Sequence, residues 1–480
     1  MGADEDSMLP MVVSHVCRHW RYLALHTPAL WRRISLDSRL RMWSERLARA
    51  RACTLDVEIL PQAQLIPSRP RRHYLDAQTV QLYMHMISPY INRWRSLTID
   101  FEHYAPYLWN ASLSVCCGFG PSVQALRLEH LSLVHPNNDD TKEFLLFNGY
   151  APRLRSVKLN GIRLTWMPSL FANITSLDYT HHGFTRGMDA EVEIFKMLKV
   201  CSRLRDLRLA FPTHTRKTMR LYDTPLPARE RIPFNDLRTL TIHIEGGDIP
   251  SALIALIARF DLRRLRKLIL SSSALSIPTR DTYPIYTQHH STHNVFPFFS
   301  RIRKFQKALP RLPSLRRLEV KHAWCRLSFL RDVLMQQVPC LDKLALHSAF
   351  LDNGFLWDLG EICRGRYRVE HNVQGNGMPR VVYMPLRVVE IVGSGYLHGN
   401  GIVDTIKRML GGGVVWVKEI WVRDCVGVNE EVVQRALRFG VPIRIFWDSS
   451  GGGAKSRKGG GSGFAAMGTN ALTWTRRRMG

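Results

Sequence analysis

Hydrophobic positions recur along most of the chain in one short pattern, apolar-x-x-apolar-x-apolar, whose last three positions alternate. Alternation of this kind predicts a strand with one buried face. Eleven copies of the pattern lie between Trp94 and Val422. Their central residues are Leu97, Leu126, Val157, Leu177, Leu207, Leu240, Leu268, Leu318, Leu344, Val389 and Ile420.

Successive central residues mostly stand roughly 26 to 33 positions apart, which is near the period of leucine-rich repeats. Helical spacing fills many of the intervals, at 191–200, 251–259, 327–337 and 403–410. One such unit cannot bury its own apolar face, so neighbouring units must stack and share a core. We therefore predict an α/β fold in which an irregular leucine-rich-repeat solenoid, a parallel strand ladder with return helices, spans 94–447. The wider spacings predict insertions at 271–313 and 347–385. An ordinary α/β protein with leucine-rich strands is the alternative.

Residues 12–35 precede the ladder and show helical spacing of apolar residues on both sides of a break at Thr27-Pro28. The first apolar face holds Val13, Val16, Trp20 and Leu23, and the second holds Leu30, Trp31 and Ile34. A segment this short cannot bury two tryptophans by itself, so it requires a partner surface. Residues 36–93 then predict linking helices at 39–50 and 78–90 and an alternating strand at 54–59.

The run VCRHWRYLALHTPALW, from Val16 to Trp31, resembles the second half of a fungal F-box-like domain, whose pattern is VCRxWRxxALxTPxLW. The resemblance implies a substrate receptor of an SCF-type ubiquitin ligase, whose F-box helices dock onto a small adaptor protein. It implies adaptor-binding or F-box packing roles for Val13, Val16, Trp20, Leu23, Leu30 and Trp31. The family domain opens with a Leu-Pro and an amphipathic helix farther upstream. Here only a short polar lead, 1–11, precedes the run, so the F-box is expected to be truncated.

The composition of the chain indicates its cellular compartment. The chain has 480 residues, of which 45% are hydrophobic, and it contains no apolar run of membrane-spanning length. It also lacks a secretory signal pattern. Its nine cysteines are odd in number and show no CxxC spacing, which is typical of a reduced cytoplasmic or nuclear protein. Residues 449–480 are rich in Gly and Ser and carry no acidic residue, so 448–480 is predicted to be a disordered basic tail.

No motif for catalysis is present. Neither a phosphate-binding glycine loop nor a GxSxG or HExxH motif occurs. His289-His290-x-x-His293 and His181-His182 have no cysteine or carboxylate cluster beside them in the sequence, so both are interpreted as loop histidines rather than metal ligands. The sequence therefore predicts no enzyme, no metal site and no cofactor.

The formal net charge of +27 suggests an acidic partner. Residues flanking the last core position of each repeat are expected to face outward on the concave side, where a target would bind. These positions hold five basic and five acidic residues, so this face is mixed rather than a phosphate groove. The proposed target-binding positions are Arg127, Glu129, Lys158, Asp178, Arg208, Glu319, Lys321, Glu390 and Arg423.

Three functions follow as hypotheses. The first is the substrate-recognition subunit of an SCF-type ubiquitin ligase, which binds a protein target through the solenoid. The second is a solenoid scaffold for protein–protein interaction that does not recruit a ligase, because its F-box is incomplete. The third is a basic protein that contacts nucleic acid nonspecifically through its tail or loops.

Overall fold

The computed structural model divides the chain into two compact units, Met1–Ala228 and Arg229–Gly480. This division falls inside the span 94–447 that the repeat pattern predicts as one domain. The structure describes residues 9–36, 40–60, 76–101, 107–138, 140–212, 226, 230–273, 299–348, 351–365, 369–370, 380–381, 386–394, 397, 402, 404–405, 417–425, 444–448, 463–468 and 471–476.

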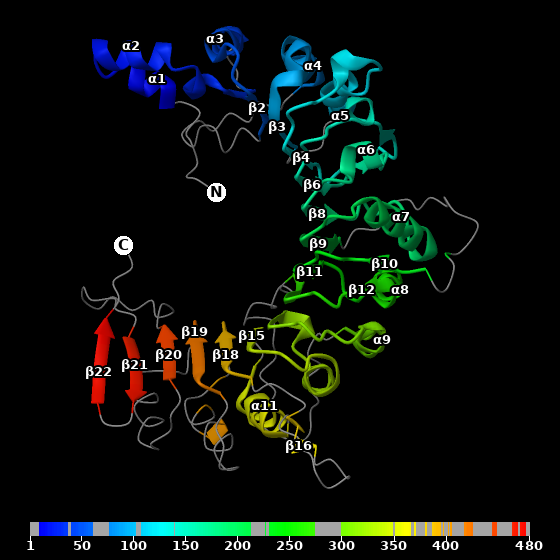
Figure 1. Ribbon diagram of the computed structural model, residues 1–480, viewed down its shortest axis with the longest axis vertical. Helices are drawn as coiled ribbons and strands as arrows, with labels where there is room; N and C mark the ends of the chain where they lie inside the picture. The colour runs from blue at the N-terminus through cyan, green and yellow to red at the C-terminus, as the bar shows by residue number, and fades with distance from the viewer. Residues whose placement is uncertain are drawn as a thin grey trace, which may run out of the picture. The chain divides into compact units, whose positions relative to one another are not determined.

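Unit 1 alternates strands with helices and short helical turns (Figure 1). Its strands are β1 (Arg33–Ser35), β2 (Leu55–Ile59), β3 (Trp94–Asp100), β4 (His130–Val134), β5 (Glu143–Phe144), β6 (Ser156–Asn160), β7 (Arg163–Leu164), β8 (Ser176–Thr180) and β9 (Asp206–Phe211). Its helices are α1 (Leu9–Ser14), α2 (Arg18–His26), α3 (Leu40–Ala50), α4 (Ala77–Ile87), α5 (Leu108–Leu113), α6 (Pro168–Phe171) and α7 (Gly187–Val200). Its 3-10 turns are η1 (Pro28–Trp31), η3 (Ser88–Arg93), η4 (Ser114–Cys116), η5 (Pro121–Val123) and η6 (Phe147–Gly149).

The main sheet of unit 1 is parallel, in the order β1-β2-β3-β4-β6-β8-β9. Its apolar residues meet in register, so that each strand places a buried side chain beside the buried side chain of its neighbour. This core row runs through Ile34, Val57, Leu97, Leu131, Val157, Leu177 and Leu207, all of them at most 1% exposed. Helices α4 to α7 lie along one side of these strands (Figure 1).

One predicted strand of unit 1 is misplaced. Residues 123–133, VQALRLEHLSL, contain two overlapping copies of the repeat pattern, one ending at Leu128 and the other at Leu133. The prediction used the first copy, whereas strand β4 forms from the second and pairs Leu131 with Leu97. Leu126, the predicted core residue, is 45% exposed. Both frames fit the period, so only pairing with the neighbouring strands decides between them.

Residues 12–35 also form different helices and strands from those predicted. The first predicted helix breaks at 15–17 into α1 and α2, and Arg21 Nε donates to Ser14 O across the break at 2.9 Å. The second predicted helix is the single turn η1, followed by strand β1. Ile34 was expected on a helix face, but it is a buried strand residue paired with Val57. A sheet edge at β2 was available for pairing, and it overrides the local helical spacing.

Unit 2 continues the same alternation within itself. Its strands are β10 (Ile232–Pro233), β11 (Thr239–Ile244), β12 (Phe260–Asp261), β13 (Lys267–Ser272), β14 (Arg317–Lys321), β15 (Lys343–His347), β16 (Val369–Glu370), β17 (Arg380–Val381), β18 (Val388–Val392), β19 (Glu419–Arg423), β20 (Arg444–Asp448), β21 (Gly463–Gly468) and β22 (Ala471–Arg476). Its helices are α8 (Ser251–Arg259), α9 (Ile302–Ala308), α10 (Leu327–Asp332) and α11 (Asn353–Gly365), with the 3-10 turn η8 (His322–Trp324) and the π-helical turn η9 (Val333–Gln337).

The predicted strands of unit 2 are confirmed in register. From β11 to β20 the sheet is parallel, and its core row is Leu240, Leu268, Leu318, Leu344, Val389, Ile420 and Ile445. The return helices predicted at 251–259 and 327–337 appear as α8 and as α10 with η9. The predicted insertions contain α9 and α11, while His289, His290 and His293 lie outside the described residues.

The C-terminal residues differ from the predicted disordered tail. Strands β21 and β22 form an antiparallel pair, and β21 pairs antiparallel with β20. The segment ALTWTR alternates apolar and polar residues as a strand does, a signal that the surrounding Gly- and Ser-rich composition hides.

The chain is thus a mixed α/β protein with a long parallel sheet and helices. Among the helices that the structure describes, none has the length and apolar character needed to cross a bilayer.

Candidate functional site

Helices α1 and α2 and the turn between them expose large apolar side chains. Val16, Trp20 and Leu23 recur four and three residues apart and are 66%, 49% and 41% exposed. Leu9 and Val12 of α1 are exposed as well. Apolar surface gathered in this way marks a contact site for another surface. Of the six residues predicted for adaptor binding or packing, Val16, Trp20 and Leu23 are therefore free to dock.

Trp31 has the opposite environment. Its side chain is 2% exposed, its Nε1 donates to Ala24 O at 2.7 Å, and the Arg49 guanidinium of α3 lies 4.5 Å from the ring centroid. Leu30 and Val13 are half-buried. Trp31 therefore packs the segment onto α3 of its own chain, and the predicted set splits into an exposed part and a more buried part.

The polar face of the unit 1 sheet keeps only some of the predicted target-binding residues together. Lys158, Asp178 and Arg208 are register partners on β6, β8 and β9. Arg208 Nη1 lies 2.7 Å from Asp178 Oδ1. Arg127 and Glu129 precede β4 and are not part of the sheet face, because the strand formed in the other frame. Ser132 occupies the position predicted for them.

On the unit 2 sheet, the two acidic residues that were predicted to bind a target, Glu319 and Glu390, are buried beside basic side chains. Glu319 lies 2.9 Å from Lys321 Nζ and 3.3 Å from Arg317 Nη2. Its side chain is 9% exposed, and the Glu390 side chain is 5% exposed. Burial raises the pKa of each carboxyl, but the hydrogen bond from Lys321 or Lys343 and the charges of the surrounding basic groups together outweigh it and lower the pKa.

Glu390 forms two ion pairs, one of them with Arg423, which was also predicted to bind a target. Arg423 Nη1 lies 3.2 Å from Glu390 Oε1, and Lys343 Nζ lies 2.7 Å from Oε2. The predicted mixed face of unit 2 is thus largely paired within itself. Such pairing fixes the side chains and leaves little net charge to attract a target by electrostatics alone.

Two aromatic residues on this face were missed from the sequence. Trp421 and Phe446 occupy the same register row as Glu390, and their rings stack with centroids 4.1 Å apart. The Arg423 guanidinium lies 5.0 Å from the Trp421 ring centroid. Aromatic and arginine side chains of this kind provide much of the free energy of binding at protein interfaces. Both positions alternate with core residues, so the strand period could have identified them.

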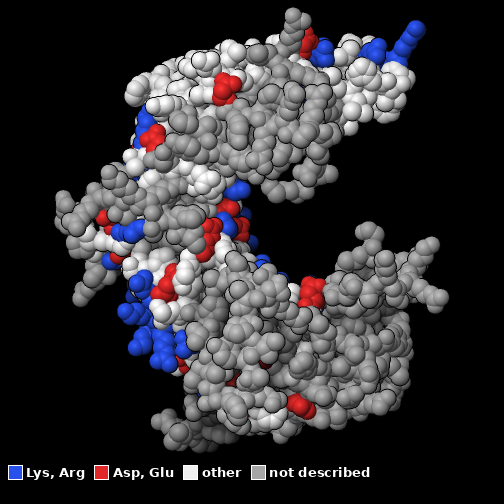
Figure 2. Space-filling view, turned by 180° about the vertical axis from the view of Figure 1, so that it is seen from behind, with Lys and Arg blue, Asp and Glu red and all other residues white. Residues whose placement is uncertain are grey.

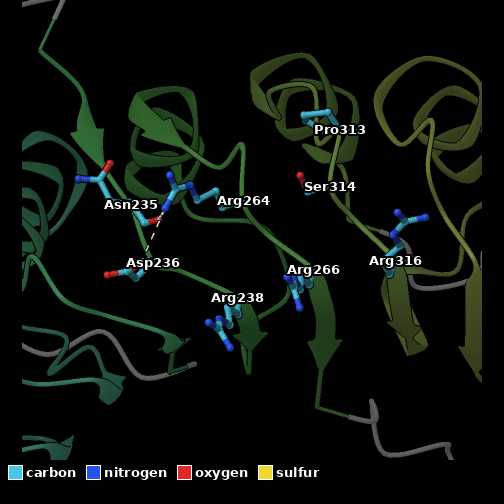
Figure 3. Close-up of a pocket in the computed structure, with 8 residues that line it drawn as sticks. All are labelled: Asn235, Asp236, Arg238, Arg264, Arg266, Pro313, Ser314 and Arg316. Carbon is cyan, nitrogen blue, oxygen red and sulfur yellow. Dashed lines mark hydrogen bonds and ion pairs between the residues drawn. The ribbon is translucent and has the colours of Figure 1, made fainter.

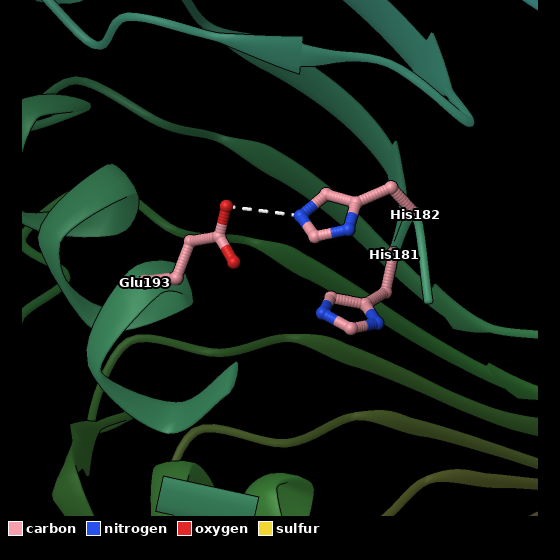
Figure 4. A group of neighbouring side chains, drawn as sticks. All are labelled: His181, His182 and Glu193. Atoms are coloured by element: carbon pink, nitrogen blue, oxygen red, sulfur yellow. Dashed lines mark hydrogen bonds and ion pairs between the residues drawn. The ribbon is translucent and has the colours of Figure 1, made fainter. Parts of the chain in front are cut away.

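His181 and His182 lie in the connection between β8 and α7, as the loop interpretation predicts, but they are not solvated loop residues. Both side chains are buried directly after β8, and they face Glu193 of α7 (Figure 4). His182 Nε2 donates to Glu193 Oε1 at 2.9 Å, and the Thr185 hydroxyl donates to Oε2 at 2.7 Å. The acidic partner stands eleven residues away, on the inward side of a helix, which is why adjacent sequence gave no signal.

The cluster perturbs the protonation of its members. Burial, followed by the neighbouring His182, lowers the pKa of His181 to about 3. Burial by itself raises the pKa of the Glu193 carboxyl, but the hydrogen bond and charge of His182, with smaller contributions from Thr185 and His181, bring it down to about 2. Glu193 is therefore ionised and His181 neutral near neutral pH.

His181, His182 and Glu193 have the composition of a metal site, and their ligand atoms all lie within 4.8 Å of one another. The hydrogen bonds occupy those atoms. The Nδ1 atoms of the two histidines accept the backbone N–H of Gly183 and Phe184, at 3.2 and 3.0 Å. Each Nε2 therefore carries the proton and donates it, so that binding a cation would require moving the proton to a nitrogen that a backbone donor already faces. The arrangement fits a structural clamp between β8 and α7 better than a metal centre.

Comparison with known proteins adds no identification. No family model matches the chain, and no curated protein matches it. The resemblance of residues 16–31 to an F-box-like domain therefore stays a prediction.

Proposed function

We propose that the chain is a substrate-recognition subunit of an SCF-type ubiquitin ligase, in which α1 and α2 dock onto the adaptor protein and a leucine-rich-repeat solenoid binds a protein target. The exposed apolar surface of Val16, Trp20 and Leu23 carries this proposal. Those residues belong to the run that resembles the F-box-like domain. In this role the chain supplies recognition, and the chemistry of ubiquitin transfer belongs to other subunits.

The division between Trp20 and Trp31 supports a docking role for α2. Were the segment only a cap on the sheet, its larger apolar residues would be expected to point inward together. Instead Trp31 supplies the internal packing while Trp20 stays half exposed, as do Val16 and Leu23. Tryptophan is one of the residue types enriched at interface hot spots.

The target-binding part of the proposal rests on the polar face of unit 2. Two ion pairs, Glu319–Lys321 and Glu390–Arg423, form the polar frame of this face, and the stacked pair Trp421–Phe446 continues the register row of Glu390. A frame whose charges are already paired selects a target by shape and by the geometry of its hydrogen bonds. This favours a folded or extended protein segment over a simple polyanion at this face.

Binding to the purified adaptor protein tests the docking role. The full chain should bind, and Trp20→Ala should weaken binding by at least about 30-fold, the effect of a hot-spot residue. Tyr22→Ala provides the matched control, because Tyr22 is an exposed aromatic residue on the other side of α2 and stacks on His26 of its own helix. Its affinity should stay within about threefold of the unmodified chain.

Two outcomes would contradict the docking role. If the unmodified chain does not bind the adaptor at micromolar concentrations, the chain is better regarded as a protein-interaction scaffold without ligase recruitment. If Trp20→Ala and Tyr22→Ala weaken binding equally, the contact does not use the apolar surface of α2.

A further inference from the structure

Unit 2 contains a cavity of about 710 Å³ lined by four arginines (Figure 3). Its volume lies within the range of about 300–1,000 Å³ that is typical of ligand sites. The lining residues are Asn235, Asp236, Arg238, Arg264, Arg266, Pro313, Ser314 and Arg316. With one aspartate against four arginines, the lining carries a net charge of +3. None of its lining residues belongs to the apolar surface of α2 or to the ion pairs of Glu319 and Glu390.

The repeat itself places three of the arginines in one row. Arg238, Arg266 and Arg316 each stand directly before a strand, at the ends of β11, β13 and β14. Their backbones are joined, because Arg266 N donates to Arg238 O and Arg316 N donates to Arg266 O, both at 2.9 Å. Neighbouring strands lie about 4.8 Å apart, so the three side chains begin along a line of roughly 10 Å.

Two of the four arginines are held by the protein. Arg264 Nη1 donates to Asn235 O at 2.9 Å and lies 3.9 Å from Asp236 Oδ1. Arg316 Nη1 donates to Cys340 O at 3.4 Å. Within the described part of unit 2, the structure gives no ion pair or hydrogen bond for the side chains of Arg238 and Arg266, and both residues are exposed. Positive charges held this close together repel one another unless an anion joins them.

We propose that this cavity binds the phosphate backbone of a nucleic-acid duplex, with Arg238 and Arg266 contacting phosphates and Arg264 and Arg316 flanking them. The site differs from the tail and loops to which the sequence assigned nucleic-acid contact. Figure 2 shows Lys and Arg side chains at several places on this face, with a dense group on the lower left. A duplex carries one charge per 3.4 Å of helix axis on each strand, so a row of roughly 10 Å can reach more than one phosphate.

The lining favours a duplex over the other polyanions. It contains no aromatic side chain, whereas sites for single strands provide aromatic rings on which unpaired bases stack. It offers Pro313 as its only wholly apolar side chain, whereas a peptide site usually includes apolar pockets for side chains. Guanidinium groups and the polar groups of Asn235 and Ser314 suit phosphate oxygens, which position a duplex without reading its sequence.

Fluorescence anisotropy with a labelled duplex of mixed sequence tests the site. Arg238→Gln/Arg266→Gln in the full chain should weaken binding at least about tenfold at low salt. It should also flatten the plot of log affinity against log salt by about 1.8, since each lost phosphate contact contributes about 0.9. The matched control is Arg303→Gln/Lys307→Gln, which removes the same charge from exposed positions on α9 outside the cavity. Its salt slope should equal that of the unmodified chain.

Binding of other polyanions in the same assay identifies the ligand. DNA and RNA duplexes of equal length show which source of backbone is preferred, and two unrelated DNA sequences should bind within about threefold of each other, because phosphate contacts carry no sequence information. If poly-glutamate of matched charge binds more tightly than both duplexes at the same salt, the site takes an acidic protein segment and the proposal is overturned. Equal losses in the two double variants would also overturn it, since the attraction would then come from diffuse charge.

A measurement on the unmodified chain keeps the test independent of how the variants fold. Phenylglyoxal modifies accessible guanidinium groups, and peptide mapping by mass spectrometry reports each site. A bound duplex should slow the modification of Arg238 and Arg266 at least about fivefold and leave that of Arg303 unchanged, because only contacted guanidinium groups are shielded. Unchanged modification of Arg238 and Arg266 under saturating duplex would refute the site.

Discussion

Trp20 and the His181-His182 pair both differ from the burial that their residue types predict. The apolar residue is exposed, and the polar residues are buried. Trp20, a large apolar residue at helical spacing, is half exposed on α2. His181 and His182, two polar residues interpreted as loop residues, are buried after β8. Both sites lie in unit 1, so the difference does not come from two kinds of fold.

The difference lies in the partners that the chain provides. The histidines find Glu193, Thr185 and two backbone donors, and a buried polar group that is fully hydrogen-bonded costs little. Trp20 finds no such enclosure from the described residues, whereas Trp31 does. Whether a side chain is buried therefore depends on the groups that the fold places around it. Trp20, the apolar residue that stays exposed, is the one expected to contact a partner.

The largest expected effect comes from the buried tryptophan. Trp31→Ala should lower the free energy of unfolding by about 3–5 kcal/mol, because it leaves a cavity between η1 and α3. Urea unfolding followed by circular dichroism measures it. A loss below about 1 kcal/mol would show that the segment does not pack onto α3.

The second largest loss of stability is expected when Glu193, the hydrogen-bond acceptor of His182 and Thr185, is removed. Glu193→Ala deprives His182 Nε2 and the Thr185 hydroxyl of their acceptor and should cost about 2–4 kcal/mol in the same unfolding assay. Lys196→Ala, an exposed position on the same helix, is the control and should change the free energy by less than about 0.5 kcal/mol. Equal effects at the two positions would mean that the clamp does not stabilise unit 1.

The clamp should also make stability depend on pH. The pKa of His181 falls from 6.5 in the unfolded chain to about 3 in the folded protein, so below pH 6.5 the unfolded state binds more protons. Glu193, whose pKa falls from 4.5 to about 2, adds to the same trend below pH 4.5. Stability should therefore decrease on acidification through both ranges.

Unfolding at about pH 7.5 and about pH 5.5 isolates the histidine, because the Glu193 contribution is still complete there. His181→Gln should show a smaller loss of stability between these two conditions than the unmodified chain. An identical loss in both proteins would mean that His181 is not the group that titrates.

The smallest effect on stability is expected at Trp20. Trp20→Ala should change the free energy of unfolding by less than about 1 kcal/mol, because the side chain is half exposed already. The same variant should lose adaptor binding as proposed above. A stability loss comparable to that of Trp31→Ala would remove the contrast between the two tryptophans.

The repeat pattern predicted a large part of the fold. Ten of its eleven central residues lie in the strands that the pattern indicates, since alternation of apolar residues reflects burial of one strand face directly. The exception is Leu126, where two overlapping frames satisfy the same period. A local pattern cannot separate two frames that are locally equivalent.

The candidate sites depended more on tertiary structure. The sequence indicated that residues 12–35 need a partner surface, and it placed Lys158, Asp178 and Arg208 on one row. It did not separate Trp20 from Trp31, because both fit an apolar helix face equally well. Only the pairing of β1 with β2 and the packing of α3 decided which tryptophan is enclosed.

By itself, then, the sequence determined ten of the eleven predicted repeat strands and their period, because each strand's alternation is a local property of the chain. The tertiary structure decided the environment of particular side chains. It buried His181 and His182 against a residue of α7, and it aligned Arg238 with Arg266, a residue of the next repeat. These contacts join residues from separate elements, and their formation depends on register and packing that no short segment contains.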